Sequence, residues 1–155
     1  MLLIRLQTKQ KMVHSSRFGN ELVHYNPSTN SLDKVETDSV LNGKKVLVYF
    51  SAHWCPPCCA FSPKLVAMYN ELKKAGNQGF ELVFVSRDQD EQHMKEYMKE
   101  VHMPWYAIPF NAQLAGSLCS EFEIDGIPFV GMVDAEGKRV KECPDYDIAG
   151  IKKFL

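Results

Sequence analysis

Two cysteines, Cys55 and Cys58, stand three residues apart and enclose the prolines Pro56 and Pro57. A pair at this spacing on the first turn of a helix can close a small disulfide ring. The unpaired N–H groups and partial positive charge of a helix N-terminus favour a thiolate over a thiol. Proline suits the first helical position because it has no N–H to leave unsatisfied, and two prolines stiffen the dipeptide between the cysteines. We therefore predict dithiol exchange, with Cys55 facing solvent as the attacking nucleophile and Cys58 as the resolving thiol.

Metal binding is the main alternative for such a pair. Tetrahedral zinc needs four ligands, usually completed by a second Cys-x-x-Cys or a paired His motif. Cys119 and Cys143 stand alone far downstream, and no His-x-x-x-His follows. The sequence therefore favours redox chemistry and predicts no metal, while a metal or iron–sulfur scaffold on Cys55, Cys58 and Cys59 stays open as a third hypothesis.

A second motif, Gly126-Ile127-Pro128, precedes an apolar run about 70 residues after the cysteines. A proline that opens a strand in a core-like run is unusual unless its peptide bond is cis or the strand lies at an edge. Opposite the cysteines, a cis proline would aim the Ile127 backbone at an extended substrate. Trp54 either offers an apolar docking surface or only packs against the disulfide. The residues that we predict to bind substrate are Trp54, Pro56, Pro57, Ile127 and Pro128.

The elements that must position these residues alternate between strand and helix. The N-terminal part reads as a small hairpin over residues 22–35. Buried strands are predicted at Val46–Phe50 and Glu81–Val85, and amphipathic helices at 57–74, after a capping box at Asp88 and Glu91, and at 114–122. A terminal hairpin is predicted from Phe129–Val133 and Lys138–Val140. This order predicts an α/β fold, a three-layer α/β/α sandwich with a mixed central sheet.

Length and composition fit one globular domain. The chain has 155 residues, 45% apolar and 24% charged, with a formal net charge of −1. We expect no nucleic-acid partner, because the charge is near neutral, and no membrane partner, because no apolar stretch approaches about 18 residues. Five cysteines, three of them clustered, indicate a reducing compartment rather than a secreted disulfide framework. We predict a cytoplasmic monomer.

We divide the chain into an extended lead-in, residues 1–17, and one domain over residues 18–155. The first 18 residues are basic and contain no acid, so a mitochondrial leader is the alternative for the localisation.

With these motifs in place, the chain resembles the tryparedoxin/nucleoredoxin branch of the thioredoxin superfamily. The resemblance runs from about Phe18 to Arg139. It is carried by five segments: Tyr49–Cys58, Phe61–Leu65, Val83–Asp88, Met103–Phe110 and Gly126–Pro128.

The resemblance implies a thioredoxin-like domain that acts as a protein-disulfide reductase through Cys55 and Cys58. Its substrates would be oxidised proteins such as a peroxiredoxin. It would need no bound cofactor, and its electrons would come from an external thiol such as trypanothione or glutathione. The alternative within the same branch is a nucleoredoxin-like redox-sensing interaction module with low turnover.

Four features depart from the pattern of that branch: Cys59, Phe129, His53 and the segment after Val140, which is short and poorly matched. Cys59 stands where members commonly carry Arg, and Phe129 follows the proline where Thr is usual. His53 replaces a small or polar residue. Tyr49 stands where many thioredoxins, though not this branch, bury a carboxylate. Proton transfer to Cys58 must then rely on water or another group.

Overall fold

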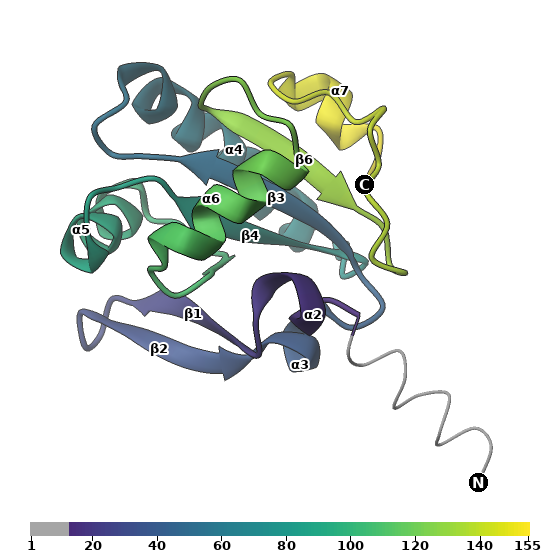
Figure 1. Cartoon of the computed structure of the whole chain (residues 1–155). Helices are drawn as coiled ribbons and strands as arrows, with labels where there is room; N and C mark the ends of the chain where they lie inside the picture. Colours follow the sequence, from purple (N-terminus) through teal and green to yellow (C-terminus); the bar gives the residue numbers. More distant parts are fainter. Residues whose placement is uncertain (1–12) are drawn as a thin grey trace, which may run out of the picture.

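The structure, a computed structural model, describes residues 13–155. These residues form six strands with helices around them, and Figure 1 shows how they are arranged. The strands are β1 Glu21–Asn26, β2 Ser31–Glu36, β3 Lys45–Ser51, β4 Phe80–Ser86, β5 Tyr106–Ala107 and β6 Phe129–Val133. The helices of this part of the chain are α2 Ser15–Phe18, α3 Thr37–Leu41, α4 Pro56–Lys74, α5 Glu91–Val101, α6 Ala112–Glu121 and α7 Ile148–Lys152. None of these helices combines the length and the apolarity needed to cross a bilayer.

The strands form one mixed sheet in the order β2-β1-β5-β4-β3-β6. Strand β4 runs parallel to both β3 and β5, whereas β6 is antiparallel to β3 and β1 is antiparallel to β2 and β5. The parallel centre requires helical crossovers, because parallel neighbours cannot be joined by a tight turn. Helix α4 is the crossover from β3 to β4, so the chain must start that helix at the carboxyl end of β3.

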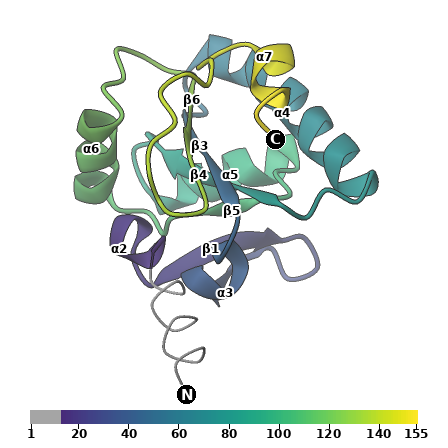
Figure 2. The same cartoon turned by 90° about the vertical axis from the view of Figure 1, so that its right-hand side faces the viewer.

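Helices cover both faces of the sheet, with α4, α5 and α7 on one side and α6 on the other (Figure 2). Alternate residues of β3 supply the two cores, since side chains of a strand point to opposite faces. Leu47 and Tyr49 join the core beneath α4 and α5, and Val48 and Phe50 join the core beneath α6. The predicted three-layer α/β/α sandwich with a mixed sheet is confirmed.

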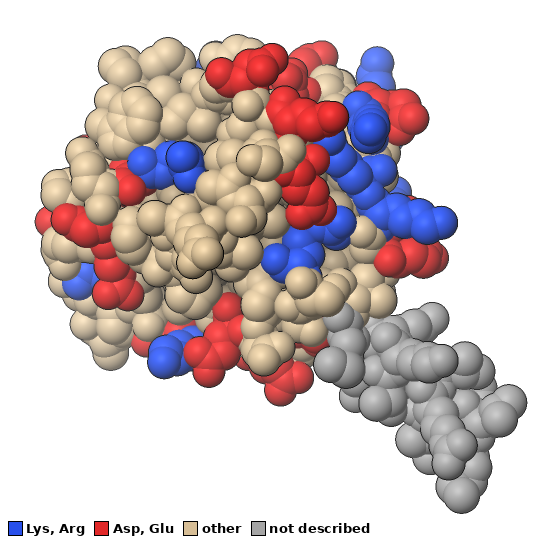
Figure 3. Space-filling view, in the orientation of Figure 1, with Lys and Arg blue, Asp and Glu red and all other residues tan. Residues whose placement is uncertain are grey.

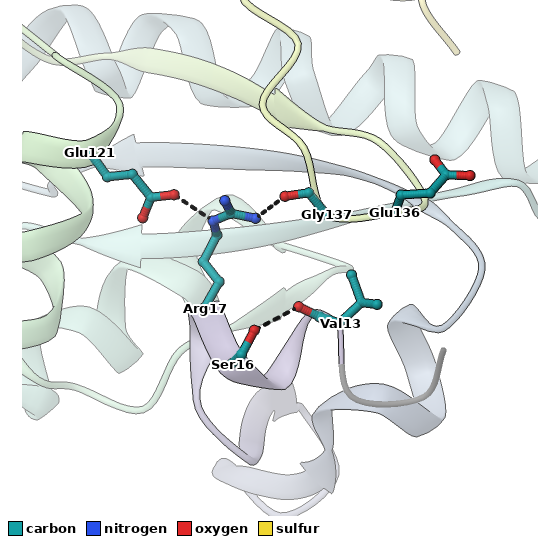
Figure 4. Close-up of a pocket in the computed structure, with 6 residues that line it drawn as sticks. All are labelled: Val13, Ser16, Arg17, Glu121, Glu136 and Gly137. Carbon is teal, nitrogen blue, oxygen red and sulfur yellow. Dashed lines mark hydrogen bonds and ion pairs between the residues drawn. The ribbon is translucent and has the colours of Figure 1, made fainter. Parts of the chain in front are cut away.

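The lead-in prediction is wrong for residues 13–17, which are not extended. Residues 13 and 14 form a turn and residues 15–17 belong to α2, and the buried His14 and Phe18 anchor the segment. Arg17 ties it to the domain, with Nε 2.7 Å from Oε1 of Glu121 and Nη1 2.7 Å from the carbonyl of Gly137 (Figure 4). This contact lies at the end of the sheet opposite to the start of α4. Residues 1–12, on which the leader hypothesis mainly rests, lie outside the described residues.

Two other predicted elements are corrected. Asp88 does not cap α5; Asp90 does, with Oδ1 2.9 Å from the His93 N–H, because Asp88 is buried and bonded elsewhere. The second strand of the terminal hairpin is reduced to a single bridge between Val133 and Arg139. There the Arg139 side chain leaves the sheet to donate to the carbonyl of Phe122 at 2.7 Å.

Candidate active site

Cys55 and Cys58 lie where β3 ends and α4 begins. Cys55 is the N-cap, with Pro56 and Pro57 as the first two helical residues. The backbone N–H of Cys58 donates to Cys55 Sγ at 3.3 Å. This bond satisfies one of the amide groups that a helix start leaves unpaired, and it places a hydrogen-bond donor at the nucleophilic sulfur.

Cys55 is less accessible than the sequence predicted, whereas Cys58 lies on the inside as expected. Cys58 has no exposed surface, and Cys55 is 5% exposed rather than facing solvent. The reason is Ile127, which packs against the small cluster of Ala52, Cys55 and Cys58. The order of accessibility still makes Cys55 the outer sulfur and Cys58 the inner one.

The loop with the second motif lies directly against the nucleophile. The peptide bond between Ile127 and Pro128 is cis, and β6 is also an edge strand, so both of the alternatives that the sequence left open are present. Cys55 Sγ lies 3.8 Å from the carbonyl oxygen of Ile127. The sequence separation between these residues is 72, and the pairing of β6 with β3 closes it.

Trp54 is 56% exposed and therefore does not only pack against the cysteines. Its Nε1 donates to the carbonyl of Arg87 at 3.0 Å, which fixes the indole at the rim of the site. Figure 3 shows the upper left of this face, over the loop that leads into α4, almost bare of charged side chains. A rim with few charges and an exposed indole is suited to a protein surface rather than to a small charged ligand.

Asp88, which the sequence predicted to be a helix cap, instead bonds the loop that forms this rim. It is buried, its Oδ1 accepts the His53 N–H at 2.8 Å, and its Oδ2 accepts the Ser86 hydroxyl at 2.7 Å. The loop that carries Trp54 is therefore bonded to the end of β4. The only sequence signal was an acidic residue just after a buried strand.

Comparison with known proteins agrees with this geometry. The family model described as thioredoxin-like matches residues 42–139, which include both cysteines and the cis proline. The chain belongs to the thioredoxin-like family.

Two groups of known proteins are similar to this chain. Probable nucleoredoxin 1 of Arabidopsis thaliana is 46% identical over 112 residues, 72% of this chain and 19% of that protein. Human nucleoredoxin is 43% identical over 110 residues, 70% of this chain and 24% of that protein. This thioredoxin-like chain thus spans only about a fifth to a quarter of the length of these nucleoredoxins.

Solved structures give the second group. Native tryparedoxin I from Crithidia fasciculata has a TM-score of 0.72 at 32% identity, over 92% of this chain and 91% of the other. A complex of tryparedoxin II with glutathionylspermidine has a TM-score of 0.69 at 30% identity, over 84% and 85% of the two chains. The expected membership of the tryparedoxin/nucleoredoxin branch is confirmed.

A chain of buried hydroxyl groups lies behind the inner cysteine of this thioredoxin-like site. The Tyr97 hydroxyl is 2.6 Å from both Ser51 Oγ and Ser62 Oγ, and Ser62 Oγ is 2.6 Å from the Tyr49 hydroxyl. These residues come from β3, α4 and α5, and all four are buried. Ser51 bonds to Cys58, so these hydroxyls are candidates for the group that exchanges a proton with Cys58.

The electrostatics of this pocket hold the inner sulfur in its neutral form. Burial raises the pKa of the Cys58 thiol to about 12, its contact with Cys55 adds to the rise, and a hydrogen bond from Ser51 opposes it. Burial also raises the pKa of Tyr97 to about 12. The Cys58 thiol and the Tyr97 phenol therefore both hold their protons at neutral pH.

The third thiol of the cluster lies outside this pocket. Cys59 is exposed, and its Sγ donates to the carbonyl of His53 at 3.2 Å. The small loss of solvent there raises the pKa of Cys59, and the nearby Cys55 adds to the rise. The His53 ring stacks on Tyr97 and contacts the Glu100 carboxylate, so it serves packing at the rim. Within residues 13–155, no three His, Cys, Asp or Glu side chains converge as metal ligands.

Proposed function

We propose that this protein is a protein-disulfide reductase that reduces oxidised proteins, such as a peroxiredoxin, through Cys55 and Cys58. The observation that carries the proposal is the backbone N–H of Cys58 directed at Cys55 Sγ, with the Ile127 carbonyl 3.8 Å from the same sulfur. A donor at the sulfur stabilises developing thiolate. A cis proline loop beside it leaves backbone free to align an extended substrate, and Trp54, Pro56, Pro57, Ile127 and Pro128 form the proposed substrate surface.

The reaction balances in two exchanges. Cys55 thiolate attacks one sulfur of the substrate disulfide, that S–S bond breaks, and the released substrate sulfur takes up a proton. Cys58 then attacks Cys55 Sγ, and the proton that Cys58 loses is taken up by the second substrate sulfur. The mixed disulfide breaks, the second substrate thiol leaves, and a Cys55–Cys58 disulfide remains.

An external thiol must return two electrons and two protons to restore the dithiol. We propose a low-molecular-weight thiol such as trypanothione or glutathione, because a related tryparedoxin II binds glutathionylspermidine. We also propose that the protein works as a cytoplasmic monomer. Turnover assays with trypanothione, glutathione and thioredoxin reductase, side by side, would identify the electron donor.

A Cys58→Ser variant tests the reductase proposal. Without the resolving thiol, the protein should accumulate a covalent adduct with its disulfide substrate at Cys55, which intact-mass spectrometry detects and dithiothreitol releases. A Cys55→Ser variant is the matched control and should form no adduct. Absence of an adduct with every disulfide offered would contradict the proposal.

The second candidate is a nucleoredoxin-like redox-sensing module, favoured by the 46% identity to a nucleoredoxin. Such a module would hold its partner with the same face and turn over poorly. Partner capture by the Cys58→Ser protein that survives dithiothreitol, together with negligible turnover of the wild type, would favour this function.

A further inference from the structure

Cys59 brings a third thiol to the helical turn that carries the redox pair. Its backbone N–H donates to the carbonyl of Cys55 at 3.1 Å, so Cys55 and Cys59 are one full turn apart on α4. Side chains three and four residues apart share a face of a helix, so Cys55 has two neighbouring thiols on that face. Cys58 is fully buried, whereas Cys59 is exposed. The nucleophile therefore has one inner and one outer neighbour.

The spacing allows a disulfide from Cys55 to either neighbour. In a helix with a rise of about 1.5 Å per residue, Cα atoms are about 5 Å apart at a separation of three residues and about 6 Å apart at four. Disulfides join residues whose Cα atoms are about 4.4–6.8 Å apart. A Cys55–Cys58 bridge and a Cys55–Cys59 bridge both fall within this range.

The Cys59 side chain is directed back toward the loop that precedes the helix. Its Sγ donates to the carbonyl of His53, two residues before Cys55, at 3.2 Å. The charge of Cys55 contributes to the raised pKa of Cys59, as expected for two sulfurs at short range. Because the Cys59 side chain is exposed, its rotation toward Cys55 costs this hydrogen bond but is not blocked by core packing.

The two neighbours of Cys55 also differ in how they can lose a proton. Burial raises the pKa of Cys58 to about 12, and its side chain has no contact with solvent. Burial also raises the pKa of Cys59, but this residue is at the surface, where water can accept its proton. An inner thiol that is slow to ionise leaves the mixed disulfide at Cys55 open to attack by the outer one.

We propose that Cys59 is a second resolving thiol, which competes with Cys58 for the mixed disulfide at Cys55. The proposal rests on the reductase function proposed above and adds a catalytic residue to it. The Cys59 thiolate attacks Cys55 Sγ, the bond from Cys55 to the substrate sulfur breaks, and that sulfur takes up the proton that Cys59 lost. A Cys55–Cys59 disulfide remains. Attack of Cys58 on Cys55 Sγ then converts this bridge into the Cys55–Cys58 disulfide, and the proton of Cys58 passes to Cys59.

The test loads Cys55 with one equivalent of a linear peptide 2-pyridyl disulfide, and peptide mapping at the first time point verifies the site. In Cys58→Ser the adduct should form and then decay at least about tenfold faster than in Cys58→Ser/Cys59→Ser, because only the single variant keeps an intramolecular thiol. The decay should release the peptide thiol and leave a Cys55–Cys59 disulfide, which tandem mass spectrometry identifies. Cys58→Ser/Cys119→Ser removes a partly exposed thiol on α6 instead. It is the matched control and should decay like Cys58→Ser.

An adduct of Cys58→Ser that persists as long as that of Cys58→Ser/Cys59→Ser would overturn the role of Cys59. A decay rate proportional to protein concentration would also overturn it, because the attacking thiol would then belong to another molecule. The serine at position 59 replaces an exposed side chain, so the comparison does not depend on a change in the core. Failure of Cys58→Ser/Cys59→Ser to form any adduct at Cys55 would instead overturn the reductase function.

Discussion

The N–H of Cys58 points at Cys55 Sγ from 3.3 Å, so the resolving residue stabilises negative charge on the nucleophile through its backbone. Its own side chain does the opposite, because it is fully buried and holds its proton. Cys58 thus assists the attack of Cys55 through its backbone N–H. Its own protonated thiol delays the second exchange until a substrate has been captured.

This contrast predicts selective alkylation. With a Cys58 pKa raised to about 12, only about one thiol in a thousand is ionised at pH 9, and the thiol is buried as well. Iodoacetamide at pH 7 to 9 should therefore modify Cys55 in the reduced protein and spare Cys58, as peptide mass spectrometry would measure. The same protein in 6 M guanidinium chloride is the control and should label both. Equal labelling of the two cysteines in the folded protein would be inconsistent with the structure.

The raised pKa of Cys58 also makes the stability of the fold depend on pH. The folded state binds the Cys58 proton more tightly than the unfolded chain does, so this contribution is complete below the ordinary value of 9.0. It is lost as pH rises from there toward about 12. Cys58→Ala should accordingly flatten the fall of the unfolding free energy at alkaline pH.

The hydroxyl chain predicts a defect in resolution rather than in capture. Tyr97→Phe removes the hydroxyl that joins Ser51 and Ser62, so the proton of Cys58 loses its buried path. We expect the resolving exchange, followed by stopped flow after mixing with excess disulfide, to slow by about tenfold or more. Adduct formation at Cys55 in the Cys58→Ser background should keep its rate. Ser51 and Ser62 would each lose one hydrogen-bond partner, which should also cost about 1–2 kcal/mol of stability.

Tyr25→Phe is the matched control for that experiment. The Tyr25 hydroxyl bonds to Asn30 on the exposed hairpin at the far edge of the sheet, so its loss should leave both exchanges unchanged. If Tyr97→Phe slowed capture and resolution equally, the hydroxyl chain would be structural only. A shift of the pH profile of resolution toward higher pH in Tyr97→Phe would support the proton path.

The features that the sequence predicted well are local. The cysteine pair, the prolines and the helix after them lie within one segment whose spacing is typical of a helix start. Pro128 before an apolar run indicated a cis bond or an edge strand, because proline is rare in the interior of a sheet. Such signals depend on neighbours in the chain, so they survive without any knowledge of the fold.

The features that it missed are assembled from distant segments or lack a pattern. Ser51, Ser62 and Tyr97 meet only because β3, α4 and α5 pack together, and each alone reads as an ordinary polar or core residue. Strand β5 has two residues, too few to show alternation. Tyr146 follows a stretch without periodicity, so nothing in the sequence indicated that its ring stacks on Phe61.

Replacing Gly131 by alanine and replacing Gly116 by alanine should change the free energy of unfolding in opposite directions. A Cβ on Gly131 in β6 would lie 2.5 Å from the Phe122 ring, which is fully buried and packs on Phe50. Gly131→Ala should therefore cost about 1–3 kcal/mol of unfolding free energy. A Cβ on Gly116 in α6 meets nothing within 4 Å, so Gly116→Ala should stabilise by about 0.5–1 kcal/mol. Urea titrations would measure both, and a neutral Gly131→Ala would contradict the described packing of β6.

The N-terminal segment should make the fold sensitive to mild acid through His14. Burial lowers the pKa of His14 in the folded state, although Asp38 and Asp134 favour its protonation and Arg17 opposes it. Below the ordinary value of 6.5 the unfolded chain binds a proton that the folded chain resists, so stability falls as pH decreases from there through the folded pKa. His14→Phe should keep the stacking on Phe18 and remove this loss.

Urea midpoints at pH 7.5 and pH 5.5 would test this, with His93→Gln as a control of opposite sign. Hydrogen bonding to Asp90 raises the pKa of His93, so its protonation stabilises the fold below 6.5 and that contribution disappears as pH rises through the folded pKa. His93→Gln should therefore steepen the acid loss, whereas His14→Phe should reduce it. If His14→Phe lost as much stability in acid as the wild type, the acid sensitivity would come from another group and not from the His14 imidazole.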